Sequence, residues 1–254
     1  MFKRSLRPFP ALVLVILLAV TMVVTQAQPT SLVMVTEVWP PFRMNDAQSP
    51  SGFAGIDIDL TLELSARIGI PIEIARVPWA RALEMMRTGT ADLITGVAWT
   101  EERAQFMAYA ATSYASVRPT FLAPKGRGAS VQAYGDLQGK SIGLSTNSAY
   151  FPQFNEDKTL KKVGLSTEVQ ILQMLALGRI DLAIGTDPNL SWDTARLGLK
   201  DKVEPTAWQP DYRTALFLAV SAKSQAANLV GQIDQAIRSM VADGMMDQIL
   251  NAYR

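Results

Sequence analysis

The chain alternates between stretches with helical spacing of apolar residues and short continuous apolar runs. Residues 56–68 place Ile or Leu at every fourth position, and Gly69 follows them. Residues 56–64 also alternate strictly between apolar and other residues, which by itself is the pattern of a strand. Asp57 and Asp59 suit the first turn of a helix and glycine suits its end. We therefore predict a helix that ends at Gly69.

A helix–strand unit occurs twice. Residues 85–97 read MMRTGTADLITGV, and residues 174–186 read MLALGRIDLAIGT. Each has an apolar helix end, a glycine stop and a short apolar strand that begins with Asp-Leu. Two such units predict two α/β lobes. Both strands end in small or polar residues, and ligands of open α/β sheets bind at the carboxyl ends of strands, so we expect a cleft between the lobes.

The same pattern gives the remaining organisation. It predicts strands over residues 31–38, 116–124, 141–145 and 180–185, helices opened by Pro78 and over 101–108 and 167–177, an extended crossover over 212–222, and a helix from Leu229 to Met240. Two extended crossings between lobes would act as a hinge. We expect residues 28–116 and 217–254 to form lobe 1 and residues 117–216 to form lobe 2.

The N-terminal residues predict export. Three basic residues precede an apolar run over residues 11–24, and Thr25-Gln26-Ala27 supplies small residues at a cleavage position. We expect a cleavable signal peptide over residues 1–27 and a periplasmic location. The alternative is an uncleaved anchor, but about 14 apolar residues fall short of the roughly 20 that a spanning helix needs.

Composition excludes several function classes. The net charge of +1 falls to −2 without the three cations of residues 1–27. A negative net charge does not favour binding to nucleic acid, and we expect none. The chain has no histidine and no cysteine, which removes the usual transition-metal ligands, disulfides, and serine or cysteine protease centres. We expect no cofactor, no metal and a monomer whose stability comes from its hydrophobic core, without disulfides.

One arginine stands out as a candidate anion-binding residue. Thr100 is a plausible helix N-cap, which places Arg103 in the first turn, where a cation opposes the helix dipole. The strand end over residues 95–99, with Gly96, offers backbone amides beside it. Such an arginine is better suited to gripping a carboxylate than to stabilising the helix. The alternative is a surface arginine paired with one of the two glutamates before it.

These segments together resemble a known family. GFAGIDIDLTLELSARIG, PWARALEMMRTGTADLITGVAWTEERAQFMAYAATSY, DLQGKSIGLSTNS, LGRIDLAIGTDPN and ADGMMDQILNAYR are similar to the extracellular solute-binding proteins of family 3, the polar amino-acid receptors of ABC transporters. The resemblance spans essentially the whole mature chain. It implies an α/β type II periplasmic binding fold, two-lobed and hinged, that closes over a small solute and serves an ABC permease. Gly96, Thr100 and Arg103 match the family's carboxylate-binding motif.

The resemblance also places aromatic residues at the ligand. Trp39 and Trp79 fall where family members sandwich the solute, although Trp79 at helical spacing with Leu83 is also typical of a core stripe. Arg81 is a further cation expected at the cleft, and its alternative is solvation beside Glu84.

Three positions depart from the family pattern. Ala98 stands where the family has Ser or Thr. Asn147 and Ser148, which we expect at the start of a helix after the strand over 141–145, replace a glycine-rich turn, and their amides would still donate to an anion. The shared Pro-Asn places Thr186, not Asp187, where the receptors carry the aspartate that pairs with the ligand ammonium. A buried ammonium without a carboxylate is costly. A carboxylate-bearing ligand without the conventional ammonium contact is therefore a contender.

Three functions follow from these residues. The first is a binding protein without chemistry, in which Arg103 holds a carboxylate and the lobes close over the solute. The second is an enzyme like the family's periplasmic cyclohexadienyl dehydratases, with Glu37 and then Asp187 as the acid or base. The third is a sensory receptor that does not feed a transporter. We favour the first.

Overall fold

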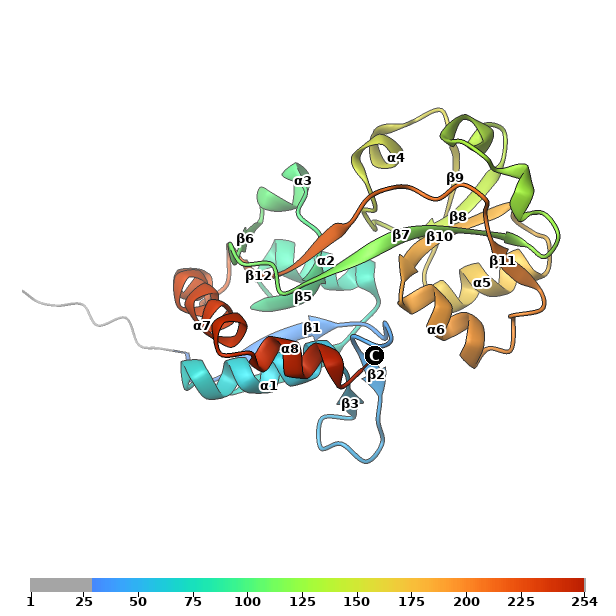
Figure 1. Cartoon of the computed structure of the whole chain (residues 1–254). Coiled ribbons are helices and arrows are strands. Elements are labelled where there is room, and N and C mark those ends of the chain that lie inside the picture. The colour runs from blue at the N-terminus through green and yellow to red at the C-terminus, as the bar shows by residue number, and fades with distance from the viewer. Residues whose placement is uncertain (1–28, 254) are drawn as a thin grey trace, which may run out of the picture.

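The computed structural model describes residues 29–253 and shows two α/β lobes joined by two long strands (Figure 1). The predicted signal peptide lies outside the described residues. No helix in residues 29–253 is both long and apolar enough to cross a membrane.

Lobe 1, on the left in Figure 1, is built on strands in the order β4-β1-β5-β12, of which β12 spans Thr214–Ser221. β1, β4 and β5 are parallel, and β12 runs antiparallel to β5. Apolar residues pack on both faces of β1, as expected of a parallel strand: Leu32 and Met34 on one side, Val35 on the other. Its elements are β1 (Leu32–Thr36), β2 (Met44–Asn45), β3 (Phe53–Ala54), α1 (Ile56–Ile68), β4 (Ile72–Arg76), α2 (Trp79–Thr88), β5 (Leu93–Val97), α3 (Glu101–Ala104), β6 (Met107–Tyr109), α7 (Val230–Ala242) and α8 (Met245–Asn251).

Lobe 2 continues the sheet in the order β7-β10-β8-β9, with β11 paired to β7. β10, β8 and β9 are parallel, and helices pack on both faces of this sheet over two apolar clusters. Its elements are β7 (Ala115–Pro124), β8 (Ser141–Ser145), α4 (Pro152–Glu156), β9 (Lys161–Leu165), α5 (Glu168–Ala176), β10 (Leu182–Asp187), α6 (Asn189–Arg196) and β11 (Val203–Pro205).

The lobes are joined where β7 and β12 (Thr214–Ser221) pair. Their antiparallel register matches Thr214 with Val117 and Leu216 with Ala115. Beyond this short ladder β12 continues along β5 in lobe 1, and β7 continues along β10 in lobe 2. Two adjacent strands are a connection about which lobes can rotate with few broken contacts.

Local sequence signals explain most of these elements. The helix predicted from Ile56 is confirmed as α1, and Gly69 caps it in the left-handed conformation with φ 71°. Pro78 is the N-cap of α2, and Gly89 ends that helix in the same way as Gly69 ends α1. Thr100 caps α3 as predicted, its hydroxyl accepting from the Arg103 amide.

Two local predictions are wrong. The helix expected over residues 101–108 stops at Ala104, because residues 107–109 pair with β12 as strand β6. A four-residue helix has little macrodipole, so the dipole argument for Arg103 fails and its role depends on its contacts. Residues 146–148 do not start a helix either. Asn147 has φ 62° in a turn, and α4 begins only at Pro152.

Candidate functional site

A cleft lies between the lobes at the carboxyl ends of β1, β5, β8 and β10 and encloses about 510 Å³ of empty space, part of it open to solvent. Residues from both lobes line it, and most of them are polar, charged or aromatic. They are Glu37, Trp39, Arg43, Trp79, Gly96, Ala98, Arg103, Val117, Ser145, Ser148, Ala149, Tyr150, Glu168, Thr186, Thr214 and Leu216.

Arg103 is buried in the wall of this cleft, with only 5% of its surface exposed. Its Nη1 donates to the Ala98 carbonyl at 2.9 Å, and its Nη2 donates to the Asn147 carbonyl at 2.8 Å. Among the described residues no carboxylate lies within ion-pair distance of it. Glu102, whose charge acts on Arg103 from farther away, pairs with Arg87 at 3.2 Å. Burial lowers the pKa of Arg103, yet a guanidinium stays charged in proteins. The structure therefore rules out a surface arginine paired with its neighbours and leaves a buried cation without a counter-ion.

The Asn147 carbonyl links the two lobes. It accepts from Arg103 and also from the indole Nε1 of Trp79 at 3.4 Å. Asn147 thus contributes an acceptor, where its amide had been expected to donate, and it does not line the inner cavity. Ser148 does line the cavity, as predicted for this turn.

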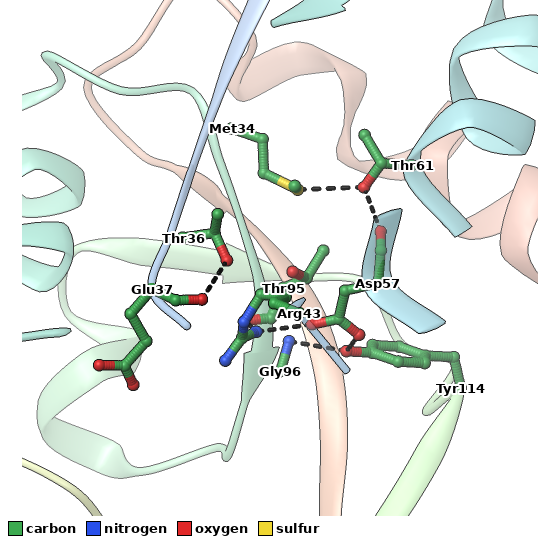
Figure 2. A network of polar contacts seen from close by, with 9 residues as sticks. All are labelled: Met34, Thr36, Glu37, Arg43, Asp57, Thr61, Thr95, Gly96 and Tyr114. Atoms are coloured by element: carbon green, nitrogen blue, oxygen red, sulfur yellow. Dashed lines mark hydrogen bonds and ion pairs between the residues drawn. The ribbon is translucent and has the colours of Figure 1, made fainter. Parts of the chain in front are cut away.

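A buried ion pair supports the floor of the cleft (Figure 2). Arg43 Nη1 lies 2.6 Å from Asp57 Oδ2 and also donates to the Thr95 carbonyl at 3.1 Å. Tyr114 donates its hydroxyl to Asp57 Oδ1 at 2.7 Å. Burial raises the pKa of Asp57, and Arg43 and Tyr114 partly offset that rise. Asp57 is the counter-ion of Arg43, while the Nε atom of Arg43 is buried without a hydrogen-bond partner.

Gly96 belongs to this network and does not offer its amide to the cleft. Its N–H donates to the Tyr114 hydroxyl at 2.7 Å. Its φ is 65°, and a Cβ at this position would lie 2.5 Å from Arg43 Nη1. The glycine is therefore needed both for its backbone conformation and for the close approach of Arg43.

Both predicted tryptophans line the cleft. Trp39 stacks on Phe42 with centroids 4.6 Å apart, and the Arg43 guanidinium lies 4.9 Å from its ring centroid. Trp79 lies 5.4 Å from the Arg103 guanidinium. Trp79 also packs in one apolar cluster with Leu83, so the core interpretation and the cleft interpretation both describe it.

Two glutamates face the cavity from opposite lobes. Glu37 follows β1, and burial raises its pKa to about 7 against the opposing effects of Arg43 and the Trp79 amide. Glu168 is the first residue of α5, and burial, then the charges of Glu37 and Asp193, raise its pKa well above the ordinary value. Carboxyl groups with such pKa values are found where a site expects a charged or reacting partner.

Thr186 and Asp187 point in different directions at the end of β10. Thr186 lines the cleft, and its hydroxyl is buried without a hydrogen-bond partner. Asp187 accepts instead from the Ser191 hydroxyl at 2.7 Å and from the Thr120 hydroxyl at 3.2 Å. Adjacent strand residues face opposite sides, so Asp187 points away from the cleft, and its Oδ1 also accepts from the Ser191 amide in the first turn of α6 at 3.2 Å.

Arg81 does not reach the cleft, contrary to expectation. It is exposed on α2 and does not line the cavity, because two residues beyond Trp79 is nearly the opposite side of a helix. It does not pair with Glu84 either. The Glu84 carboxylate pairs instead with Arg87, with Oε2 3.7 Å from Arg87 Nε.

Sequence reasoning missed Arg43, Asp57 and Glu168. The sequence placed Asp57 in the first turn of a helix, and only the burial of that turn reveals its ion pair with Arg43. Glu168 follows the N-cap Thr167 and also had the appearance of a surface residue. No cluster of His, Cys, Asp or Glu that could hold a metal occurs in residues 29–253.

The comparisons with known proteins agree with this architecture. Residues 32–254 match the bacterial extracellular solute-binding proteins, family 3. No curated protein matches the chain. Similar solved structures include an ancestral arginine-binding protein bound to glutamine, with 21% identity over 89% of this chain and 99% of that one and a TM-score of 0.76.

Two others show the range of proteins with this fold. The amino acid ABC transporter substrate-binding protein AbpA from Streptococcus pneumoniae, bound to L-arginine, has 18% identity over 88% of this chain and 93% of that one, with a TM-score of 0.73. A histidine kinase sensor domain with similarity to periplasmic binding proteins has 19% identity over 89% and 96%, with a TM-score of 0.76. By its match over residues 32–254, the chain belongs to the bacterial extracellular solute-binding proteins of family 3, and its fold is that of a type II periplasmic binding protein.

Proposed function

We propose that this protein captures a small carboxylate-bearing solute, an amino acid or related compound, in the periplasm and delivers it to an ABC transporter. The observation that carries this proposal is the buried Arg103, which faces the cleft without a counter-ion. A guanidinium held by two carbonyls keeps further donors in its planar fork, and a carboxylate is the anion that such a fork binds best.

The rest of the cleft fits a solute with an apolar or planar body. Trp39 and Trp79 present aromatic surface to the cavity, and the turn at Ser148 and Ala149 brings lobe 2 backbone to it. Closure between the lobes would remove the solute from water and strengthen its contact with Arg103.

A screen of the mature protein tests the proposal. Amino acids, polyamines, dicarboxylates and aromatic acids are tested by thermal shift, since a ligand at a hundredfold excess over its dissociation constant adds about 2.7 kcal/mol to apparent stability. A stabilising solute without a carboxylate, with none of the carboxylates effective, contradicts the proposal. A permease and an ATPase encoded beside this gene would support the transport role over a sensory one.

Glu37 favours a second candidate function. A half-buried carboxyl whose pKa is raised to about 7 has the value expected of a general acid or base at neutral pH, as a cyclohexadienyl dehydratase would require. Incubation with a cyclohexadienyl acid would then produce an aromatic product, which ultraviolet absorbance detects. If the cyclohexadienyl acid stabilises the protein but is not converted, the dehydratase function is contradicted and only the binding function remains.

Solute binding is expected to compact the protein. In residues 29–253 the chain crosses between the lobes at β7 and β12, which pair over a few residues, so closure can occur by rotation near residues 114–118 and 212–216. Small-angle X-ray scattering should show a smaller radius of gyration at saturating solute. Identical profiles with and without a solute that binds would indicate a rigid cleft.

Replacement of Asp187 by asparagine is expected to leave solute affinity nearly unchanged. Its carboxylate accepts hydrogen bonds from Ser191 and Thr120, outside the cleft. Thr186→Asp, by contrast, should raise the affinity for ordinary amino acids, because it places a carboxylate in the cavity wall. Calorimetry with one amino acid and one simple carboxylate measures both effects. A loss of about 2 to 5 kcal/mol of amino-acid binding in Asp187→Asn would assign the ammonium contact to Asp187 after all.

A further inference from the structure

Two carboxyl groups face the cleft from opposite lobes, and closure of the lobes brings them into one cavity. Glu37 follows β1 in lobe 1, Glu168 begins α5 in lobe 2, and both half-buried side chains line the cavity. We propose that closure is coupled to proton uptake by this acidic pair, so that the solute-free protein opens as the pH rises through neutrality. The inference rests on the proposed function, because closure is the step that would retain a solute.

Neither member of the acidic pair has a cation of its own in the part of the chain that the structure describes. Neither forms a salt bridge, and Glu168 Oε2 is buried without a hydrogen-bond partner. In Figure 2 the Glu37 carboxylate points away from Arg43 and makes none of the contacts drawn, while Arg43 pairs with Asp57 at 2.6 Å. A carboxylate without a counter-ion in a partly enclosed cavity is costly, and a proton removes that cost.

Opening of the lobes also removes this cost. Rotation about the short ladder between β7 and β12 separates Glu37 from Glu168 and lets water reach both carboxyl groups. Like charges repel each other less when they are farther apart and hydrated. The ionised pair therefore favours the open form, and the protonated pair favours the closed form.

Most other charged and titratable groups around the pair move together with the glutamate they face. Arg43 and Arg103 line the cavity from lobe 1, as Glu37 does. Asp193 of α6 and Tyr150 belong to lobe 2, as does the other glutamate. Interactions within one lobe are retained when the lobes rotate. They shift both forms alike and do not create the coupling.

The interactions that do change are those across the cleft. Glu37 opposes ionisation of Glu168 from the other lobe, whereas the Trp39 side chain and Arg43 favour it, each by less than Glu37 opposes it. Burial in the cavity opposes ionisation more than any of them. The groups that meet on closure therefore disfavour the ionised pair overall.

The direction of the pH dependence follows from these effects. In the closed form burial raises the pKa of Glu37 from 4.5 to about 7, and it raises that of Glu168 well above its ordinary value. In the open form both values return toward the ordinary ones, so the closed form holds more protons. Closure is therefore favoured at acidic pH. Through Glu37 this support is lost as the pH rises from about 4.5 to 7, and Glu168 acts in the same direction.

Single-molecule fluorescence energy transfer on the solute-free mature protein tests the coupling. The chain has no cysteine, so Leu62→Cys in lobe 1 and Leu177→Cys in lobe 2, both at exposed positions, allow one dye to be attached to each lobe. The ratio of closed to open molecules should fall at least about tenfold between pH 5 and pH 8. A ratio that stays constant, or that rises with pH, overturns the inference.

Glutamine variants assign the effect to the acidic pair, because glutamine has the shape of glutamate without its charge. Glu37→Gln and Glu168→Gln should each raise the closed fraction at pH 8 and reduce its pH dependence, and the double variant should remove most of that dependence. Glu73→Gln, at an exposed position on β4, is the control and should behave as the wild-type protein does. The full pH dependence in the double variant, or a lower closed fraction in either single variant at pH 8, overturns the inference.

Thermal unfolding at pH 8 verifies that the variants fold. Neither single glutamine variant should melt below the wild-type protein, because each removes a carboxylate without a counter-ion. The pH series on the labelled wild-type protein tests the inference independently of these variants.

The inference and the proposed function fail in different ways, because these measurements contain no solute. Closure that is independent of pH, together with solute binding that depends on Arg103, would remove the coupling and leave the carboxylate function. Normal solute binding by Arg103→Ala would remove the carboxylate function, while pH-dependent closure of the empty protein would stand.

Discussion

Replacement of Arg103 by alanine is expected to weaken solute binding by about 30- to 4,000-fold without unfolding the protein. The loss corresponds to about 2 to 5 kcal/mol, the usual cost when one partner of a buried, hydrogen-bonded charge pair is truncated. The fold should survive because the two carbonyls that Arg103 contacts keep other donors. Ala98 also accepts from Tyr109 at 3.2 Å, and Asn147 also accepts from Trp79. Calorimetry with a solute found by the thermal-shift screen measures the loss.

Arg81→Ala is the matched control for this experiment. Arg81 lies in the same lobe, carries the same charge and is exposed on α2 away from the cavity. The control should bind the solute as the wild-type protein does. Arg103→Lys should recover only part of the affinity, because an ammonium lacks the planar fork. Normal binding by Arg103→Ala, or unfolding of that variant, would make the arginine structural.

Arg103 also shows how far the sequence could be interpreted. Its position after Thr100 indicated a residue beside a strand end, and the structure places it in the wall of the cleft. The argument from the helix dipole is wrong, since α3 has only four residues. What distinguishes Arg103 is a pair of carbonyl contacts, one of them from residue 147 on the other lobe. Contacts between lobes leave no local pattern, so spacing and composition could not predict them.

Elements that depend on neighbouring residues were predictable. Helix α1 is confirmed against an alternating pattern, because acids at its start and Gly69 at its end are local signals. Glu168 was not predictable, because an acid in the first turn of a helix is ordinary at a surface. Its significance comes from burial and from Glu37, more than a hundred residues away in the chain.

The buried pair of Arg43 and Asp57 is expected to have the largest effect on stability. Asp57→Ala leaves the Arg43 guanidinium, which is 2% exposed, without its carboxylate at 2.6 Å and removes the acceptor of the Tyr114 hydroxyl. Removal of one partner from a buried ion pair costs about 3 to 5 kcal/mol. For a protein of this size, the midpoint of thermal unfolding should fall by about 6 to 20 °C. Asp201→Ala, at an exposed position in lobe 2, should leave the midpoint nearly unchanged.

A double replacement separates the charge from the packing. In Arg43→Met with Asp57→Leu no unpaired charge remains, so the double variant should be more stable than Asp57→Ala alone. The tight packing of Gly96 against Arg43 Nη1 should relax at the same time, and the Gly96 amide should keep the Tyr114 hydroxyl as its acceptor. Denaturation monitored by circular dichroism gives both free energies. If the double variant loses as much stability as the single one, shape complementarity at this position outweighs the buried charge.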